Sequence, residues 1–231
     1  DDNGHGTHVA GIIAAISNQI GVVGAAPEVN IYSLKVLDSN GIGSYSALID
    51  AIDWAIENDM DIIDMSLGGT AYSAILEEKL QEAYDSGILL VASAGNGGSG
   101  KDTILYPAKY SSVMAVGAVD QKNQRASFSS EGFELEIMAP GVDILSTLPN
   151  NQFGIKSGTS MAAPHVTGVA ALVLDKKRNL TVDELRGLLN YSADEIGVRE
   201  EYGNGLLNAQ NAIEQLKNFE NEQEKFIFSH I

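Results

Sequence analysis

Apolar runs with the length of β-strands alternate along this chain with segments whose apolar residues recur at helical spacing. Such alternation predicts βαβ units and therefore a mostly parallel sheet. The predicted strands cover residues 31–37, 61–67, 87–94, 113–119 and 135–138.

Two segments between these strands have the pattern of amphipathic helices that cover a sheet. Their apolar positions are Leu48, Ile49, Ile52, Ala55 and Ile56 in the first, and Leu76, Leu80, Ala83 and Tyr84 in the second. Two further segments, 7–16 and 161–174, are apolar on nearly every face, which predicts helices buried on all sides.

The C-terminal quarter has the pattern of two more helices. Thr181 and Glu184 have the spacing of a capping box, and a buried face of Leu185, Leu188 and Leu189 follows them. The second helix keeps its apolar spacing from Ala209 to about residue 218, and the polar stretch beyond predicts a solvated tail.

The composition of the chain excludes several classes of function. The 231 residues suit one large α/β domain, and the absence of cysteine excludes disulfides and thiolate chemistry. A net charge of −17 argues against binding to nucleic acid or to an anionic membrane surface. No apolar run reaches the roughly 18 residues of a membrane span. The chain starts with neither methionine nor a leader, so we expect Asp1 to lie within a longer product.

Two segments carry residues that could form a nucleophile and its base. Ser160 lies in GTSMAAPH at 158–165, and His5 lies in DDNGHGTH at 1–8. A serine hydroxyl is inert unless a neighbouring base removes its proton, and histidine does this best near neutral pH. Ser160 also stands at the start of a predicted helix, whose unpaired N–H groups favour an oxyanion. Alternatively, Ser160 only caps that helix.

The glycine-rich segment GNGGSGKD at 95–102 follows a predicted strand and nearly fits a phosphate-binding loop. Asp102 replaces the hydroxyl that would bind magnesium, and the residues up to Pro107 do not begin a helix. Nucleotide binding is therefore the weaker hypothesis.

Four motifs occur together: DNGHGTHVAG at 2–11, MSLGG at 65–69, SAGN at 93–96 and GTSMAAPHV at 158–166. In order and spacing they resemble the subtilisin family of serine proteases, in its bacterial secreted branch, over about residues 1–215. The resemblance implies a three-layer αβα fold with a mostly parallel central sheet. It implies a peptidase domain over 1–218, with a tail or linker over 219–231. It also implies serine endopeptidase activity through a Ser-His-Asp set and an acyl-enzyme.

The resemblance assigns roles to individual residues. Ser160 would attack the scissile carbonyl, His5 would transfer its proton, and Asn96 would donate a hydrogen bond to the oxyanion. An extended polypeptide substrate would be bound between strand-like edges. The residues implied to bind it are Gly41, Ile42, Gly43, Ser66, Leu67, Gly68, Ala94, Gly95 and Leu105.

Two departures from the family pattern concern the substrate pocket. Gly97 stands where many members have an acidic residue, which weakens the case for basic residues in the pocket. Leu105 stands at the pocket floor, where a small residue is usual. We expect a shallow pocket that prefers medium-sized apolar residues over Phe or Tyr.

A loop that resembles the family's calcium site spans residues 16–22. The carbonyls of Ile16, Ile20 and Val22 and the side chain of Asn18 would be the ligands, and such oxygen donors suit calcium. Other family ligands would precede Asp1, so we expect weak binding by this chain alone and tight binding in the full protein. A simple helix-ending turn is the alternative.

The aspartate of the catalytic set precedes the histidine in subtilisins, yet here the histidine is residue 5. Asp1 and Asp2 are too close to it in sequence, and Asp64 or Asp120 would give another family's order. We therefore expect an N-terminally truncated fragment, with the aspartate upstream and the N-terminal strand of the sheet missing. Such a piece should be unstable and nearly inactive, because the imidazole loses its orientation and a strand loses its neighbour.

A catalytically inactive subtilisin-like binding module is the alternative function. It predicts damaged motifs, whereas His5, Asn96 and Ser160 are all intact. The resemblance further implies an extracellular monomer that meets polypeptide substrates and its own pro-region, with a cytoplasmic location as the alternative. His8 and His165 are interpreted as hydrogen-bonded core histidines.

Overall fold

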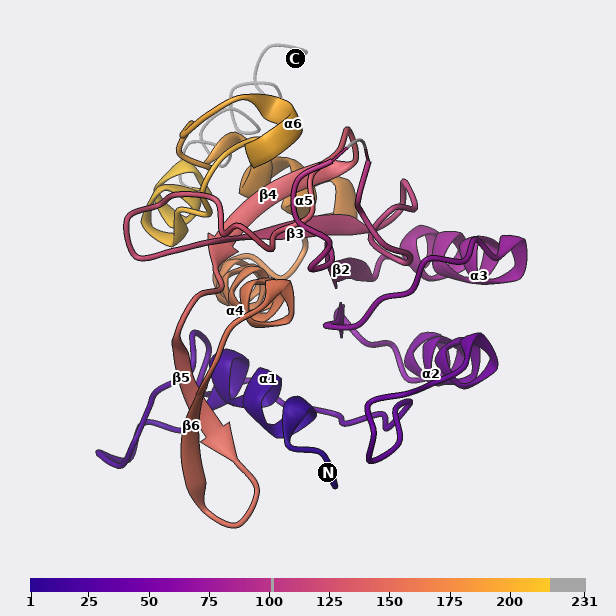
Figure 1. The fold of residues 1–231 in the computed structure, drawn as a ribbon, viewed down its shortest axis with the longest axis horizontal. Helices are drawn as coiled ribbons and strands as arrows, with labels where there is room; N and C mark the ends of the chain where they lie inside the picture. The colour runs from indigo at the N-terminus through magenta and orange to yellow at the C-terminus, as the bar shows by residue number, and fades with distance from the viewer. Residues whose placement is uncertain (101, 217–231) are drawn as a thin grey trace, which may run out of the picture.

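A parallel sheet of four strands forms the centre of the structure. The computed structural model describes residues 1–100 and 102–216. The strand order is β1-β2-β3-β4 (Figure 1), with bounds β1 Ile62–Met65, β2 Leu89–Ser93, β3 Met114–Val119 and β4 Leu135–Pro140. All three pairings are parallel. Four of the five predicted strands, and the parallel sheet, are confirmed.

Helices cover both faces of this sheet, which confirms the three-layer arrangement. On one face lie α2 (Tyr45–Glu57) and α3 (Ala74–Asp85), and on the other lie α4 (Thr159–Lys176) and α5 (Val182–Tyr191). Side chains of β2 alternate between the two cores: Leu89 and Val91 pack toward α4 and α5, Leu90 and Ala92 toward α2 and α3. The strand is buried on both faces, as expected for a parallel sheet between helices.

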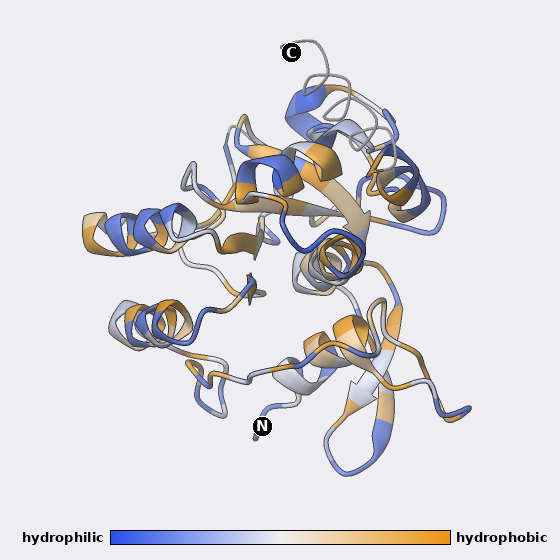
Figure 2. Cartoon of the chain, turned by 180° about the vertical axis from the view of Figure 1, so that it is seen from behind, coloured by the Kyte–Doolittle hydropathy of each residue, from blue (hydrophilic) through white to orange (hydrophobic). Residues whose placement is uncertain are grey.

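The two amphipathic helices form where the apolar spacing predicts them. Each begins at a serine whose hydroxyl accepts a backbone N–H bond, Ser44 from Ala47 and Ser73 from Leu76. Their buried residues are Leu48, Ile52 and Ala55 in α2, and Leu76, Leu80 and Ala83 in α3. Figure 2 shows hydrophobic and hydrophilic residues alternating along both helices.

The two helices predicted to be buried on all sides differ in how many of their side chains are buried. Most side chains of α4 are buried, because it packs against the sheet on one side and against α1 (His5–Ala14) on another. In α1 only one face is buried, formed by His8, Val9, Gly11, Ile12 and Ile13. The expectation of burial on all sides is thus wrong for α1, which lies beside α4 at the margin of the fold.

A hairpin that the apolar pattern does not predict joins the sheet to α4. Its strands, β5 (Ile144–Leu148) and β6 (Gln152–Lys156), pair antiparallel. Asn150 and Asn151 in the connecting loop have φ angles of 63° and 57°, a conformation that asparagine tolerates better than most residues. Three residues after β6 the chain enters α4.

The strand predicted over 31–37 is wrong for the described structure. This segment forms no ladder, and only Leu37 makes an isolated bridge, to Gly43. Ile31 and Tyr32 are 45% and 58% exposed, and β1 pairs with β2 alone. A strand needs a hydrogen-bonded neighbour, and residues 31–36 find none among the described residues.

The C-terminal part confirms the predicted capping box. Thr181 Oγ1 accepts the Glu184 N–H at 3.2 Å, and the Glu184 carboxylate accepts the Thr181 N–H at 2.8 Å. A short helix α6 (Arg199–Tyr202) follows, and residues 209–216 are helical. The predicted end of that last helix and the tail over 219–231 lie outside the described residues.

Candidate active site

Ser160 is the second residue of α4, and its side chain is free. The N-cap of the helix is Gly158, so the interpretation of Ser160 as a mere cap is wrong. The Gly158 N–H donates to the Gly141 carbonyl at 2.8 Å, which ties the start of α4 to the residue after β4. Within residues 1–100 and 102–216, neither the hydroxyl nor the N–H of Ser160 has a hydrogen-bond partner.

Asn96 lies directly beside this helix start. Its Oδ1 accepts the backbone N–H of Thr159 at 3.0 Å and the Thr159 hydroxyl at 3.1 Å. Because both partners donate, the oxygen must face Thr159 and the amide NH₂ group must point elsewhere. That NH₂ group donates to no residue that the structure describes. Two unused donors, one from Asn96 and one from the Ser160 backbone, therefore flank the candidate nucleophile.

His5 is the first residue of α1, the helix that packs against α4. Met161, next to Ser160, contacts the cluster of Val9, Ile12 and Ile13 on α1. Burial lowers the pKa of His5, and the charges of Lys156 and His8 lower it further. The imidazole is thus held in the neutral form, which can accept a proton. His5 and Ser160 are not hydrogen-bonded, and such contacts are often long without substrate.

No carboxylate in residues 1–100 and 102–216 accepts a hydrogen bond from His5. The Asp1 carboxylate instead caps α1, accepting the N–H groups of Asn3, Gly4 and Thr7 at 2.7–3.0 Å. Asp64 accepts the hydroxyls of Ser66 and Thr167 at 2.7 and 2.9 Å.

Two further acids that could have paired with His5 are occupied as well. Asp2 pairs with Lys35 at 3.3 Å. Asp120 accepts the N–H groups of Lys122 and Gln124 at 2.8 and 3.0 Å. None of these acids is the third member of a catalytic set.

Most of the residues proposed to bind substrate lie at one edge of the sheet. Residues 66–68 follow β1 and residues 94–96 follow β2, and the carboxyl ends of parallel strands share an edge. The Leu105 N–H donates to the Ala94 carbonyl at 2.9 Å, so Leu105 belongs to the same region. Its side chain lies between Gly68 and Gly95, where an added Cβ would come within 3.0 and 2.7 Å of it.

The segment of Gly41, Ile42 and Gly43 lines a separate pocket, which no residue of 66–68 or 94–96 shares. It precedes α2, is exposed, and lines an open pocket through Ile42 and Gly43. The hydroxyl of Tyr45 donates to the carbonyl of Ala71, three residues past Gly68. This bond joins the first turn of α2 to the chain beyond residues 66–68, and no hydrogen bond joins residues 41–43 to 66–68 directly.

The glycine-rich loop after Asn96 does not form a phosphate site. The N–H groups of Gly97, Gly98 and Gly100 donate to Ser130 Oγ, the Phe128 carbonyl and the Glu131 carboxylate, at 2.8–3.1 Å. A phosphate-binding loop needs these groups free, and residues 102–113 after the loop form no helix. The structure contradicts the nucleotide hypothesis.

The loop over residues 16–22 presents oxygen atoms. Asn18 Oδ1 accepts the Ile20 N–H at 3.0 Å, and the carbonyls of Ile16, Ile20 and Val22 accept no hydrogen bond from a described residue. No cluster of three or more His, Cys, Asp or Glu side chains suited to a metal occurs in the described part of the chain. A cation here would therefore be held chiefly by neutral oxygens.

The two remaining helical histidines are core residues, as interpreted. His8 Nε2 lies 3.1 Å from the carbonyls of Ile144 and Gly154, and His165 Nδ1 lies 2.9 Å from the Met161 carbonyl. Sequence reasoning missed two residues beside the site: Thr159 and Lys156. Thr159 lies within the GTS motif and could have been found there, whereas only the folded hairpin places Lys156 near His5.

The chain is similar in sequence to known proteins over most of its length. The model of the subtilase family matches residues 1–205. The chain is 53% identical over 214 residues to subtilisin DY of Bacillus licheniformis, covering 92% of this chain and 78% of that protein. It is equally identical to subtilisin E of Bacillus subtilis, of which it spans 56%. It is 48% identical to alkaline elastase YaB of a Bacillus strain, over 92% of this chain and 56% of that protein.

Proposed function

The chain belongs to the subtilase family, and we propose that the whole protein is a serine endopeptidase with Ser160 as nucleophile and His5 as its base. One observation carries the proposal. The free hydroxyl of Ser160 lies at the start of α4, beside the side-chain amide of Asn96. Thr159 donates two hydrogen bonds to the oxygen of this amide, so its NH₂ group points away from Thr159. A binding module without activity would have no need for this arrangement.

The proposed reaction has two halves. His5 takes the Ser160 proton as the hydroxyl attacks the scissile carbonyl, and Asn96 Nδ2 and the Ser160 N–H bind the oxyanion that forms. His5 then gives the proton to the leaving amine, and water hydrolyses the acyl-enzyme by the same steps reversed.

The carboxylate that orients His5 is proposed to lie outside the described residues. Each described acid that could replace it is bonded elsewhere, namely Asp1, Asp2, Asp64 and Asp120. The imidazole needs such a partner to keep its tautomer and orientation during proton transfer. Full activity is therefore expected of the whole protein.

Polypeptides are the proposed substrates. The edges at 41–43 and 66–68 would bind an extended peptide backbone, and Ala94, Gly95 and Leu105 would surround the side chain before the cleaved bond. Leu105 reduces this pocket because it occupies the space between Gly68 and Gly95. One relative is named an elastase. Elastases among the serine proteases have a small pocket for the side chain before the cleaved bond, which is the kind of pocket proposed here.

We also propose a calcium ion at the loop of Ile16, Asn18, Ile20 and Val22. The uncommitted carbonyls of this loop fit a hard cation that prefers oxygen. Its effect would be to hold together the chain that follows α1.

Location and partners are proposed from the family. Within residues 1–100 and 102–216, no helix combines the length and the apolar character needed to cross a membrane. We propose an extracellular monomer that is made with a pro-region and has its peptidase domain over 1–218.

The nucleophile can be tested directly in the full-length protein. A fluorophosphonate reagent should label the wild-type protein and the variant Ser111→Ala, whose serine is exposed and distant in sequence. It should not label Ser160→Ala. Equal labelling of Ser160→Ala would overturn the assignment, and absence of labelling in the wild type would favour the inactive module.

A further inference from the structure

The loop that follows Asn96 has little conformational preference of its own. It begins with Gly97, Gly98, Ser99 and Gly100, and none of these four residues lies in a helix or strand. Gly98 has a φ angle of 69°, which glycine adopts without strain. A loop of this composition samples many conformations unless contacts from outside hold it. Because Asn96 is its first neighbour, the loop can carry Asn96 with it when it moves.

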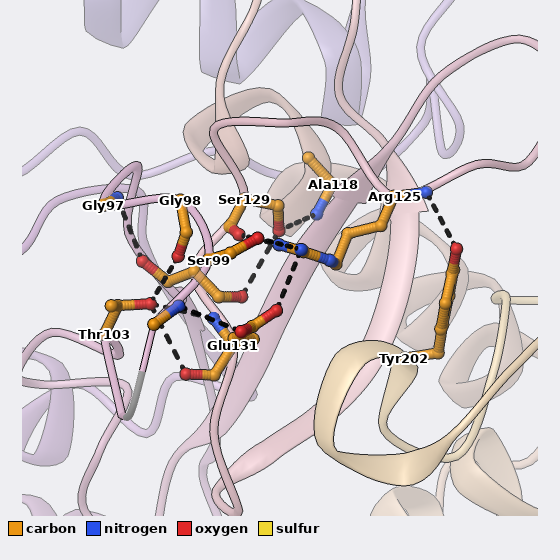
Figure 3. Close-up of polar contacts among 11 residues, drawn as sticks. Gly97, Gly98, Ser99, Thr103, Ala118, Arg125, Ser129, Glu131 and Tyr202 are labelled. Atoms are coloured by element: carbon orange, nitrogen blue, oxygen red, sulfur yellow. Dashed lines mark hydrogen bonds and ion pairs between the residues drawn. The ribbon is translucent and has the colours of Figure 1, made fainter.

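The segment 125–131 supplies those contacts (Figure 3). Besides the bonds from the N–H groups of Gly97, Gly98 and Gly100, the Ser130 N–H donates to the Gly95 carbonyl at 3.0 Å. The loop returns through Thr103, whose N–H donates to the Glu131 carbonyl and whose hydroxyl accepts the Glu131 N–H, both at 3.0 Å. The residues on both sides of Asn96 are therefore bonded to one segment.

Arg125 and Glu131 hold this segment and the loop together. One carboxylate oxygen of Glu131 accepts the Gly100 N–H at 2.9 Å, and the other lies 2.8 Å from Arg125 Nη2. The same Nη2 donates to Ser99 Oγ, and Nη1 donates to the Ser129 carbonyl, both at 2.5 Å. Figure 3 shows the two charged side chains pointing toward each other.

The Arg125–Glu131 pair is largely buried, and backbone groups beside it are hydrogen-bonded to α6. The side chains of Arg125 and Glu131 are 12% and 19% exposed. The Arg125 N–H donates to the Tyr202 hydroxyl of α6 at 3.2 Å, and the Gly132 N–H donates to the Glu200 carbonyl at 3.1 Å. Ions buried in this way add little net stability, whereas they do fix geometry where their bonds are directional.

We propose that Arg125 and Glu131 are positioning residues that fix Asn96 for oxyanion binding. The inference rests on the proposed endopeptidase function. Thr159 fixes the oxygen end of the Asn96 side chain, and the Arg125–Glu131 pair fixes the backbone that carries it. The oxyanion exists only during the reaction, so a misplaced Asn96 lowers kcat and leaves substrate binding unchanged. Displacements of about 1 Å cost up to about 100-fold in rate.

The test uses the full-length protein and a chromogenic peptide substrate. Glu131→Ala should lower kcat by between about 10-fold and 100-fold, with KM changed less than about twofold. Glu131→Gln retains an oxygen for the Gly100 N–H and should recover part of that loss. In an Asn96→Leu background, Glu131→Ala should change kcat by less than about twofold, because the group that it positions is gone.

A matched control is the second buried ion pair, between Arg186 and Glu136 at 2.6 Å, which joins α5 to β4. Glu136→Gln should lower the melting temperature and leave kcat unchanged. The inference is overturned if Glu131→Ala and Glu131→Gln fold with wild-type kcat, or if Glu131→Ala lowers kcat equally in the Asn96→Leu background. An inactive wild type would instead overturn the proposed function.

Discussion

The side chain of Leu105 lies against Gly95, so that a methyl group on this glycine would come within 2.7 Å of Leu105 Cγ. The same side chain limits the space at Gly68. These two glycines belong to the segments that follow β1 and β2, where the substrate side chain is proposed to enter. We therefore expect Leu105 to limit the depth of that proposed pocket.

Leu105→Gly should change substrate preference. The variant removes the side chain between Gly68 and Gly95, so kcat/KM for peptides with Phe before the cleaved bond should rise about tenfold relative to peptides with Val. Matched chromogenic peptides that differ only at that position provide the measurement. Leu105→Ile, which keeps the volume, should retain the wild-type preference. A wild type that already prefers Phe strongly would contradict the role of Leu105.

Thr159→Val should lower kcat, because the hydroxyl that helps to orient the Asn96 amide is lost. One neutral hydrogen bond corresponds to about 1 kcal/mol, and hence to somewhat less than a tenfold decrease. Steady-state kinetics on one peptide should show KM nearly unchanged. Thr159→Ser keeps the hydroxyl and serves as the control. A rise in KM with constant kcat would show that Thr159 acts on substrate binding instead.

Lys156→Met should shift the pH dependence of kcat/KM. The charge of Lys156 adds to burial in lowering the pKa of His5, so its removal raises that pKa. His5 is a base only when neutral, and the acidic limb of the profile should therefore move to higher pH. Lys176→Met changes an exposed lysine at the far end of α4 and should leave the limb in place. A shift to lower pH would contradict the assignment.

Asp64→Asn should stabilise the protein at neutral pH. Burial raises the pKa of Asp64 from its ordinary 3.8 to about 6. The folded state binds the proton more tightly than the unfolded state, so the free energy of unfolding falls as the pH rises through this window. Asparagine does not titrate, and it can still bond with Ser66 and Thr167.

Denaturant unfolding at a series of pH values measures this difference. The gain of Asp64→Asn over the wild type should be small near pH 4 and should reach up to about 3 kcal/mol near pH 8. Asp59→Asn replaces an exposed carboxylate whose side chain forms no hydrogen bond or ion pair with a described residue, and it serves as the matched control. A gain that is constant across pH would mean that Asp64 acts through packing and not through its charge.

Asn18→Ala should weaken the proposed calcium site. Asn18 Oδ1 is the side-chain oxygen of the loop and also accepts the Ile20 N–H, so its removal affects both ligand and loop shape. Millimolar calcium should raise the melting temperature of the wild type by several degrees, and that of Asn18→Ala by less. Ser17→Ala, in the same loop, is the control. Equal melting temperatures of the wild type with calcium and with chelator would refute the site.

Much of the fold could be predicted because its elements are encoded locally. The spacing of apolar residues predicted α2, α3 and four strands. Such a prediction is possible because the regular period of a helix or strand fixes which residues lie on the same face. The failure at residues 31–37 has the opposite cause. Its sequence is that of a strand, but strand formation depends on a partner that the described residues do not provide.

Within the site, the reactive groups could be recognised from the sequence: a serine and a histidine at helix starts, an asparagine after a strand, and motifs typical of the subtilase family. Three features became visible only in the folded chain: the direction of the Asn96 amide, the placement of Lys156 near His5, and the hydrogen bonds from the N–H groups of the glycine-rich loop to segment 125–131. These features depend on contacts between residues far apart in sequence. The spacing of apolar residues within one segment cannot predict such contacts, because they form only when the helices and strands pack together.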